Sequence, residues 1–158
     1  MFRAMRRCKQ QISQEECIEI LKSQPRGVLS VLGDDGYPYG MPLTHWYDEE
    51  SGKIYFHGAK AGHKIDALKN CDKVSFCVYD EGYREGDEWP LHIRSVIVFG
   101  RIRFVEDPER IAEMCTKLCH KFTDDEEYIQ KELTQFAARV LCLELTPEHM
   151  TGKLVKES

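Results

Sequence analysis

The chain has 158 residues, 42% of them apolar, which is enough for one sizeable hydrophobic core and too short for two comfortable domains. Its 22 basic residues are scattered and outnumbered by 27 acidic residues, which argues against a nucleic-acid-binding surface. No apolar run approaches the roughly 18 residues of a membrane-spanning helix, and residues 1–10 lack the apolar core of a signal peptide, so we expect no membrane partner.

The seven cysteines are odd in number and spread along the chain, without the regular spacing of a disulfide framework. Reduced thiols in a reducing compartment fit this pattern. We therefore expect a single cytoplasmic domain that spans residues 1–158.

The first predicted elements are a helix and a β-hairpin. Ser13 and Glu16 have the spacing of a capping box, which predicts a helix over about residues 14–23. Residues 27–32 are strand-like, and the following sequence Asp-Asp-Gly at 34–36 supplies the positive φ angles of a tight turn. The next strand, about residues 38–47, is therefore expected to be an antiparallel neighbour of the first.

Pro42 lies inside this second predicted strand. Because proline has no N–H to donate, the strand is expected at a sheet edge or a bulge, where nearby backbone groups remain available. Residues 53–57 predict another strand, which small residues interrupt at 58–62 before a short helix over 63–70.

The C-terminal half predicts long strands with helices between them. Residues 74–79 alternate as a half-buried strand, residues 80–88 form a polar loop, and a long strand covers about 92–105 with a bend at Gly100. Asp107 and Pro108 start a helix, and Thr123 with Glu126 repeats the capping signal before a second one. A last strand covers 140–145, so the fold class is α+β, mostly β, with an antiparallel barrel of about six strands.

A candidate anion site lies where the strand at 54–57 leads into the helix at 63–70. A helix N-terminus attracts anions, and Lys60, His63 and Lys64 add cationic donors. On spacing alone, a surface turn with solvated lysines explains the segment better. Phosphate contacts would also bind weakly by themselves, so a true ligand must bury an apolar body as well.

Four segments, at 35–43, 54–64, 94–101 and 151–153, resemble in order and spacing the FMN-binding split-barrel family related to pyridoxamine 5'-phosphate oxidase. The nitroimidazole reductase-like branch is the most similar. The resemblance implies a six-stranded antiparallel split β-barrel with Greek-key order, a homodimer, and one FMN in each of two clefts between the subunits.

The resemblance also implies which residues bind the cofactor. In similar proteins the segment equivalent to Pro42, Leu43 and Thr44 runs along the isoalloxazine ring. The ribityl and phosphate groups contact the positions of His57, Gly58, Ala59, His63 and Lys64, and Ser95 and Val96 are placed to complete the phosphate pocket. His57 is the candidate catalytic residue, with a hydrogen-bonded structural role as an equal alternative.

The resemblance implies an FMN-dependent oxidoreductase that passes electrons from a reduced nicotinamide, NAD(P)H, to a small nitroaromatic, nitroimidazole-like or quinone-like acceptor. A non-catalytic FMN- or haem-binding barrel is the alternative. Cys115, Cys119 and His120 share one predicted helix and could hold a metal, but small core residues explain the two thiols better, so we expect no metal site.

Overall fold

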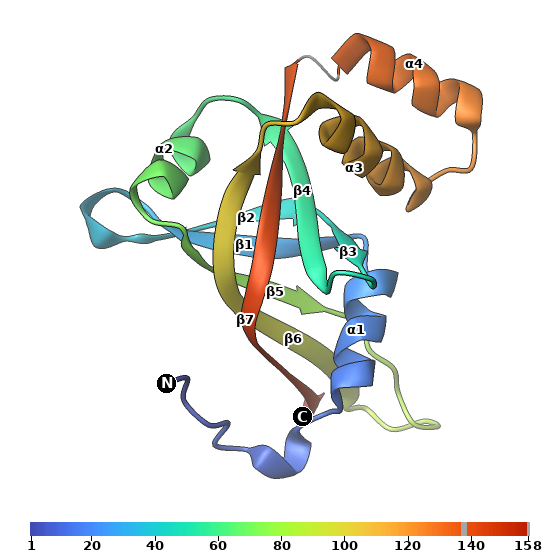
Figure 1. Ribbon diagram of the computed structural model, residues 1–158. Coiled ribbons are helices and arrows are strands. Elements are labelled where there is room, and N and C mark those ends of the chain that lie inside the picture. The colour runs from blue at the N-terminus through green and yellow to red at the C-terminus, as the bar shows by residue number, and fades with distance from the viewer. Residues whose placement is uncertain (137–138, 158) are drawn as a thin grey trace.

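The computed structural model describes residues 1–136 and 139–157, in which one curled antiparallel sheet is surrounded by helices (Figure 1). The sheet has seven strands in the order β2-β1-β5-β6-β7-β4-β3. The strands are β1 (Arg26–Leu32), β2 (Pro38–Thr44), β3 (Trp46–Asp48), β4 (Lys53–Ala59), β5 (Lys73–Tyr79), β6 (Leu91–Val105) and β7 (Val140–Glu157). The α-helices are α1 (Gln14–Ser23), α2 (His63–Asn70), α3 (Pro108–His120) and α4 (Glu126–Phe136). The predicted fold class, mostly β and antiparallel, is confirmed.

The N-terminal elements form as their local sequence predicts. The Ser13 hydroxyl accepts from the Glu16 N–H at 3.1 Å, and the Glu16 carboxylate accepts from the Ser13 N–H at 2.8 Å, which completes the capping box of α1. Asp35 and Gly36 have φ angles of 54° and 77°, the left-handed conformation that the β1–β2 turn requires.

The second predicted strand is divided into two, which is why the sheet has seven strands instead of six. β2 pairs with β1 at one edge of the sheet, whereas β3 pairs with β4 at the other. Between them the His45 ring is fully buried, with its Nε2 2.7 Å from the carbonyl oxygen of Leu21. Pro42 lies on edge strand β2, as its missing N–H demands.

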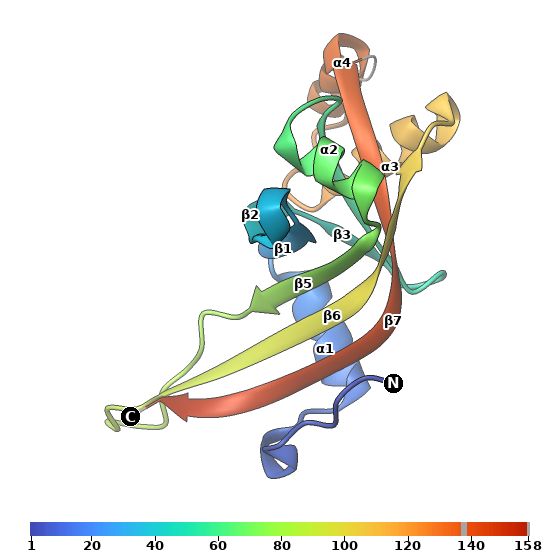
Figure 2. The same ribbon diagram turned by 90° about the vertical axis from the view of Figure 1, so that its left-hand side faces the viewer.

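β6 and β7 pair along almost their whole length and curve together (Figure 2). β7 continues well beyond the predicted end at residue 145, because the pairing shifts register between Phe99 and Gly100, leaving Pro147 opposite Gly100. A Cβ at Gly100 would lie 2.2 Å from the Thr146 carbonyl oxygen, so this close approach requires glycine.

α3 and α4 lie together at one end of the sheet, outside the barrel wall (Figure 1). The Asp107 carboxylate caps α3 by accepting from the N–H groups of Glu109 and Arg110. At the start of α4, the capping side chain is that of Asp125 and not that of Thr123. The Asp125 carboxylate accepts a hydrogen bond from the Tyr128 N–H. The Thr123 hydroxyl instead accepts from the Asp125 N–H, so the predicted capping signal was displaced by two residues.

The barrel interior holds the main core, and a smaller cluster of Tyr55, Val105, Met114 and Cys142 lies between the sheet and α3. Within residues 1–136 and 139–157, no helix has the length and apolar character needed to cross a membrane.

Candidate functional site

The first part of the site is the start of α2, where Lys64 turns back over strand β4. α2 begins at His63, and its N-cap residue is Gly62, which has a φ of 118° and no side chain to cap the helix. A Cβ built on Gly58 would lie only 2.8 Å from the Lys64 Nζ atom. The missing side chain at Gly58 thus leaves the space that the lysine occupies, and partial burial lowers the pKa of Lys64.

His63, the neighbour of Lys64, interacts with the β1–β2 hairpin. Its ring stacks on Tyr39 with centroids 4.2 Å apart, and its Nε2 lies 3.6 Å from the Asp34 carboxylate. These contacts hold α2 against the hairpin and direct His63 toward Tyr39 and Asp34. Lys64, by contrast, is the predicted contact whose cationic group lies at Gly58.

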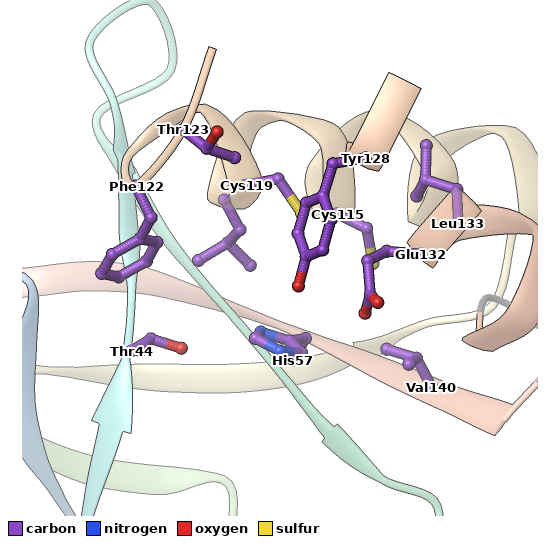
Figure 3. A pocket seen from close by; sticks show the side chains of 11 residues that line it. Thr44, His57, Cys115, Cys119, Phe122, Thr123, Tyr128, Glu132, Leu133 and Val140 are labelled. Carbon is purple, nitrogen blue, oxygen red and sulfur yellow. The ribbon is translucent and has the colours of Figure 1, made fainter. Parts of the chain in front are cut away.

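The second part of the site is a cavity of about 280 Å³ on the outer face of the barrel wall (Figure 3). Thr44, His57 and Val140 contribute from the sheet, and α3, α4 and their connection form the opposite side. The residues from the helical side are Cys115, Leu118, Cys119, Phe122, Thr123, Tyr128, Glu132 and Leu133. The Tyr128 hydroxyl and the Glu132 carboxylate point toward His57 (Figure 3), so a mainly apolar space has a few polar groups on opposite sides.

His57 connects the two parts of the site. It lies on β4 next to Gly58, and its ring faces the cavity (Figure 3). Partial desolvation and the nearby positive charge of Lys64 both lower the pKa of His57, which favours the neutral form of the ring. A neutral imidazole can both donate and accept a hydrogen bond.

The other predicted residues divide between the two faces of the sheet. Leu43 packs against the main core and Val96 is fully buried in it, so the Val96 side chain has no surface for a ligand within one protomer. Pro42 is exposed and Ser95 is half-buried on the outer face, while Ala59 ends β4 opposite Val140.

Ser95 does not line the cavity with Thr44 and His57. His57 faces Cys142 of β7, whereas Ser95 faces Lys153, eleven residues further along the same strand. At about 3.3 Å per residue, this corresponds to a path of roughly 36 Å. The structure therefore brings Thr44, His57, Gly58 and Lys64 together and leaves Ser95 elsewhere on the outer face.

Cys115 and Cys119 line the cavity instead of filling the main core. Within the described part of the chain, no group of three His, Cys, Asp or Glu side chains is arranged to hold a metal ion.

Comparison with known proteins places the chain in a family. The model of the pyridoxamine 5'-phosphate oxidase family matches residues 13–154. Among curated proteins, a 5a,11a-dehydrotetracycline/5a,11a-dehydrooxytetracycline reductase from Streptomyces rimosus subsp. rimosus is 32% identical over 85 residues. That match covers 52% of this chain and 57% of the reductase, so the chain spans little more than half of this relative.

Solved structures share the fold at low sequence identity. A candidate 5-nitroimidazole antibiotic resistance protein from Bacteroides thetaiotaomicron has a TM-score of 0.78 at 18% identity, covering 93% of this chain and 87% of that protein. The FAD and heme binding protein from Mycobacterium smegmatis has a TM-score of 0.73 at 19% identity, covering 92% of this chain and 73% of that protein. With a family match that extends over nearly the whole barrel, this chain belongs to the pyridoxamine 5'-phosphate oxidase family.

Proposed function

We propose that this protein is a flavin-dependent oxidoreductase with FMN as its cofactor, acting on a small acceptor at the cavity beside His57. The observation that carries the proposal is the position of Lys64, which crosses Gly58 next to a mainly apolar cavity. FMN combines a phosphate with an apolar ring system. The site offers the Lys64 cation to the phosphate and an apolar cavity wall to the ring system. The similarity to a reductase and to an FAD and heme binding protein supports the assignment of a flavin cofactor. FAD is the alternative to FMN.

The residues present fit a flavin only in part within one protomer. The cavity volume of about 280 Å³ is just below the range of roughly 300 to 1,000 Å³ that is typical for sites of cofactor-sized ligands. Because Ser95 also lies outside this cavity, one protomer provides part of the binding surface. A second copy is the natural source of the rest, which supports a homodimer.

The outer face of the sheet supplies a surface for that second copy. The cross-strand partners Pro42, Val28, Cys77, Ile97 and Thr151 form one row across five strands. Val28 and Ile97 are each 37% exposed, and Ser95 lies on the same face. An apolar row of this kind favours association with a second copy.

The protein's own side chains have distinct roles in this proposal. Lys64 holds the anionic group of the cofactor, and apolar side chains such as Leu118 and Phe122 exclude water from the reacting groups. His57 is placed to exchange a proton with the acceptor, because its lowered pKa keeps a neutral nitrogen available. A bound flavin supplies the hydride or electron transfer itself.

The acceptor is proposed to be a nitroaromatic, nitroimidazole-like or quinone-like molecule, with NAD(P)H as electron donor. Such acceptors are flat and apolar with polar oxygens, and the cavity pairs apolar walls with His57 and Tyr128. The reductase and the candidate nitroimidazole resistance protein among the relatives support this class.

The first test is the visible absorption spectrum of the protein as purified, with mass spectrometry of any cofactor released by heat. Released FMN or FAD supports the proposal and identifies the flavin. Oxidation of NADH or NADPH is then followed with nitroaromatic and quinone acceptors. A colourless protein that also fails to bind added flavin would refute the assignment.

A flavin- or haem-binding protein without turnover is the second candidate, because the imidazole of His57 faces the cavity and the M. smegmatis structure is an FAD and heme binding protein. A Soret band in the same spectrum would favour haem. Photoreduced flavin that no acceptor reoxidises would favour a flavin carrier over an enzyme.

A further inference from the structure

Two thiols meet in the wall of the cavity. Cys115 lies on α3 and Cys142 on β7, and their Sγ atoms are 3.9 Å apart. A disulfide requires about 2.05 Å between the sulfurs, so side-chain rotation of about 1 Å at each residue would bring them to bonding distance. The two cysteines are 27 residues apart in sequence, so this proximity results from the packing of α3 against the sheet.

The two thiols differ in access. Cys115 is half-buried and lines the cavity, whereas Cys142 is fully buried in the cluster with Tyr55, Val105 and Met114. The two thiols share a hydrogen bond in which either sulfur can be the donor. This contact lowers the pKa of Cys115, whereas the same contact together with burial raises the pKa of Cys142. The thiol that a small solute can reach is thus also the better nucleophile of the two.

The pair lies beside the candidate catalytic residue. Cys142 is the cross-strand partner of His57, and Cys115 shares the cavity wall with it. A chemical change at these sulfurs therefore alters the wall of the proposed reaction space directly.

We propose that Cys115 and Cys142 form a redox-active dithiol, in which a peroxide that enters the cavity oxidises Cys115 and Cys142 then closes a disulfide. The site is a modification site for small hydroperoxides, and it exists whether or not a flavin is bound.

The reaction balances in two steps. The Cys115 sulfur attacks the terminal oxygen of hydrogen peroxide, the O–O bond breaks, and one water leaves as Cys115 becomes a sulfenic acid. The Cys142 sulfur then attacks the Cys115 sulfur, the S–O bond breaks, and a second water leaves as the disulfide forms. The two thiols lose two electrons and two protons in total, and peroxide is reduced to two waters.

The disulfide would join α3 covalently to β7 and draw the Cys115 sulfur toward the sheet. We therefore expect oxidation to fix the helical side of the cavity and to change binding there, reversibly with dithiothreitol.

The test is to treat the purified protein with hydrogen peroxide, block remaining thiols, and map the peptides by mass spectrometry without reduction. We expect a peptide pair cross-linked through Cys115 and Cys142, with a mass two hydrogens below that of the two reduced peptides. Dithiothreitol should separate this pair into the two reduced peptides. Cys119→Ser is the matched control, because Cys119 lies on the same helix and lines the same cavity, and this variant should form the cross-link as the wild type does.

Two variants separate the roles of the pair. In Cys142→Ala, dimedone should trap a sulfenic acid on Cys115, because the resolving thiol is absent. Cys142 is fully buried, so if that variant does not fold, Cys115→Ser at the half-buried position tests the same pair and should leave Cys142 reduced. A Cys115–Cys119 cross-link, or oxidation of the exposed Cys8 with Cys115 untouched, would overturn the proposal.

Discussion

The position of Lys64 depends on the missing side chain at Gly58, and this dependence can be tested. Lys64→Ala should weaken FMN binding several-fold, because it removes the cation that lies against Gly58 at the start of α2. Gly58→Ala should weaken binding to a similar degree and leave stability nearly unchanged, since the new Cβ would displace the flexible tip of the lysine. Fluorescence titration with FMN measures both effects.

The double variant provides the critical comparison. If Gly58→Ala acts through Lys64, the two losses should not add. Lys69→Ala, in the last turn of the same helix, is the control and should bind FMN as the wild type does. Unchanged affinity in Lys64→Ala would remove this lysine from the site.

His45 predicts a loss of stability at acidic pH. Burial, and to a lesser extent the charge of Lys121, lowers its pKa from 6.5 to about 3. Below pH 6.5 the unfolded chain binds a proton that the folded chain excludes, so stability falls as the pH falls. Between pH 6.5 and pH 5 this amounts to about 2 kcal/mol.

Urea unfolding at pH 7 and pH 5 measures this effect. His45→Gln should be less stable at pH 7 but should lose most of the pH dependence, because its amide can still donate to the Leu21 carbonyl and does not titrate in this range. The control His120→Gln, at an exposed position, should leave the dependence of the free energy of unfolding on pH unchanged. An unaltered slope in His45→Gln would mean that another group is responsible.

At the residue scale, the sequence indicates residues on one side of the candidate site and none on the other. The family resemblance implies Thr44, His57, Gly58 and Lys64 as cofactor contacts, and the structure brings these four residues together. The helical side was missed, because the apolar stripe of Ile129 and Leu133 predicts a helix without indicating which surface it covers. Tyr128 and Glu132 reach the cavity only through the docking of α4, a tertiary contact with no local signal.

At the element scale, a polar network fastens α3 to the sheet. The Tyr55 hydroxyl donates to Glu144 at 2.9 Å and accepts from the Arg110 guanidinium at 3.0 Å. Burial alone would raise the pKa of Glu144, but hydrogen bonds from Arg103, Lys53 and Tyr55 outweigh it and lower the pKa to about 2. The fully buried carboxylate is thus kept ionised by its partners.

Removing the hydroxyl should loosen this attachment. Tyr55→Phe keeps the ring but leaves Glu144 and Arg110 each with one hydrogen bond fewer, and we expect a loss of about 1 to 3 kcal/mol in the free energy of unfolding. Tyr37→Phe, at a position that is 75% exposed, is the control and should have little effect. Denaturation by urea gives the stabilities, and equal values for the two variants would show that the network contributes nothing.

Strand boundaries show where local sequence patterns are insufficient. Residues 38–47 have one continuous extended pattern, yet the burial of His45 divides them between opposite edges of the sheet. Pro147 suggests the end of a strand, yet β7 continues because the register shift opposite Gly100 accommodates it. Both features depend on partners distant in sequence, whereas the boundaries of α1 and α2 follow from local signals and were predicted correctly.

At the scale of the whole molecule, the outer face of the sheet exposes apolar side chains that no other described part of the protomer covers. Val28 and Ile97 lie in a row that continues to Pro42, one of the predicted flavin contacts. Phe2 stacks on His149 and Phe99, so the N-terminal segment covers part of the neighbouring surface. A homodimer through the uncovered row would join the two outer faces and complete both cofactor sites at once.

Charge placed in this row should therefore remove both the dimer and the cofactor. In Ile97→Asp a carboxylate would be buried against the second copy without a partner, which strongly disfavours association. Light scattering should give twice 18.4 kDa for the wild type and 18.4 kDa for the variant, with flavin binding weakened several-fold in the monomer. Trp89→Glu, an exposed apolar position in the β5–β6 loop outside the row, should remain dimeric and bind flavin. A wild-type protein that is monomeric with flavin bound would show that one protomer is sufficient, because the cofactor site would then be complete without the outer face of a partner.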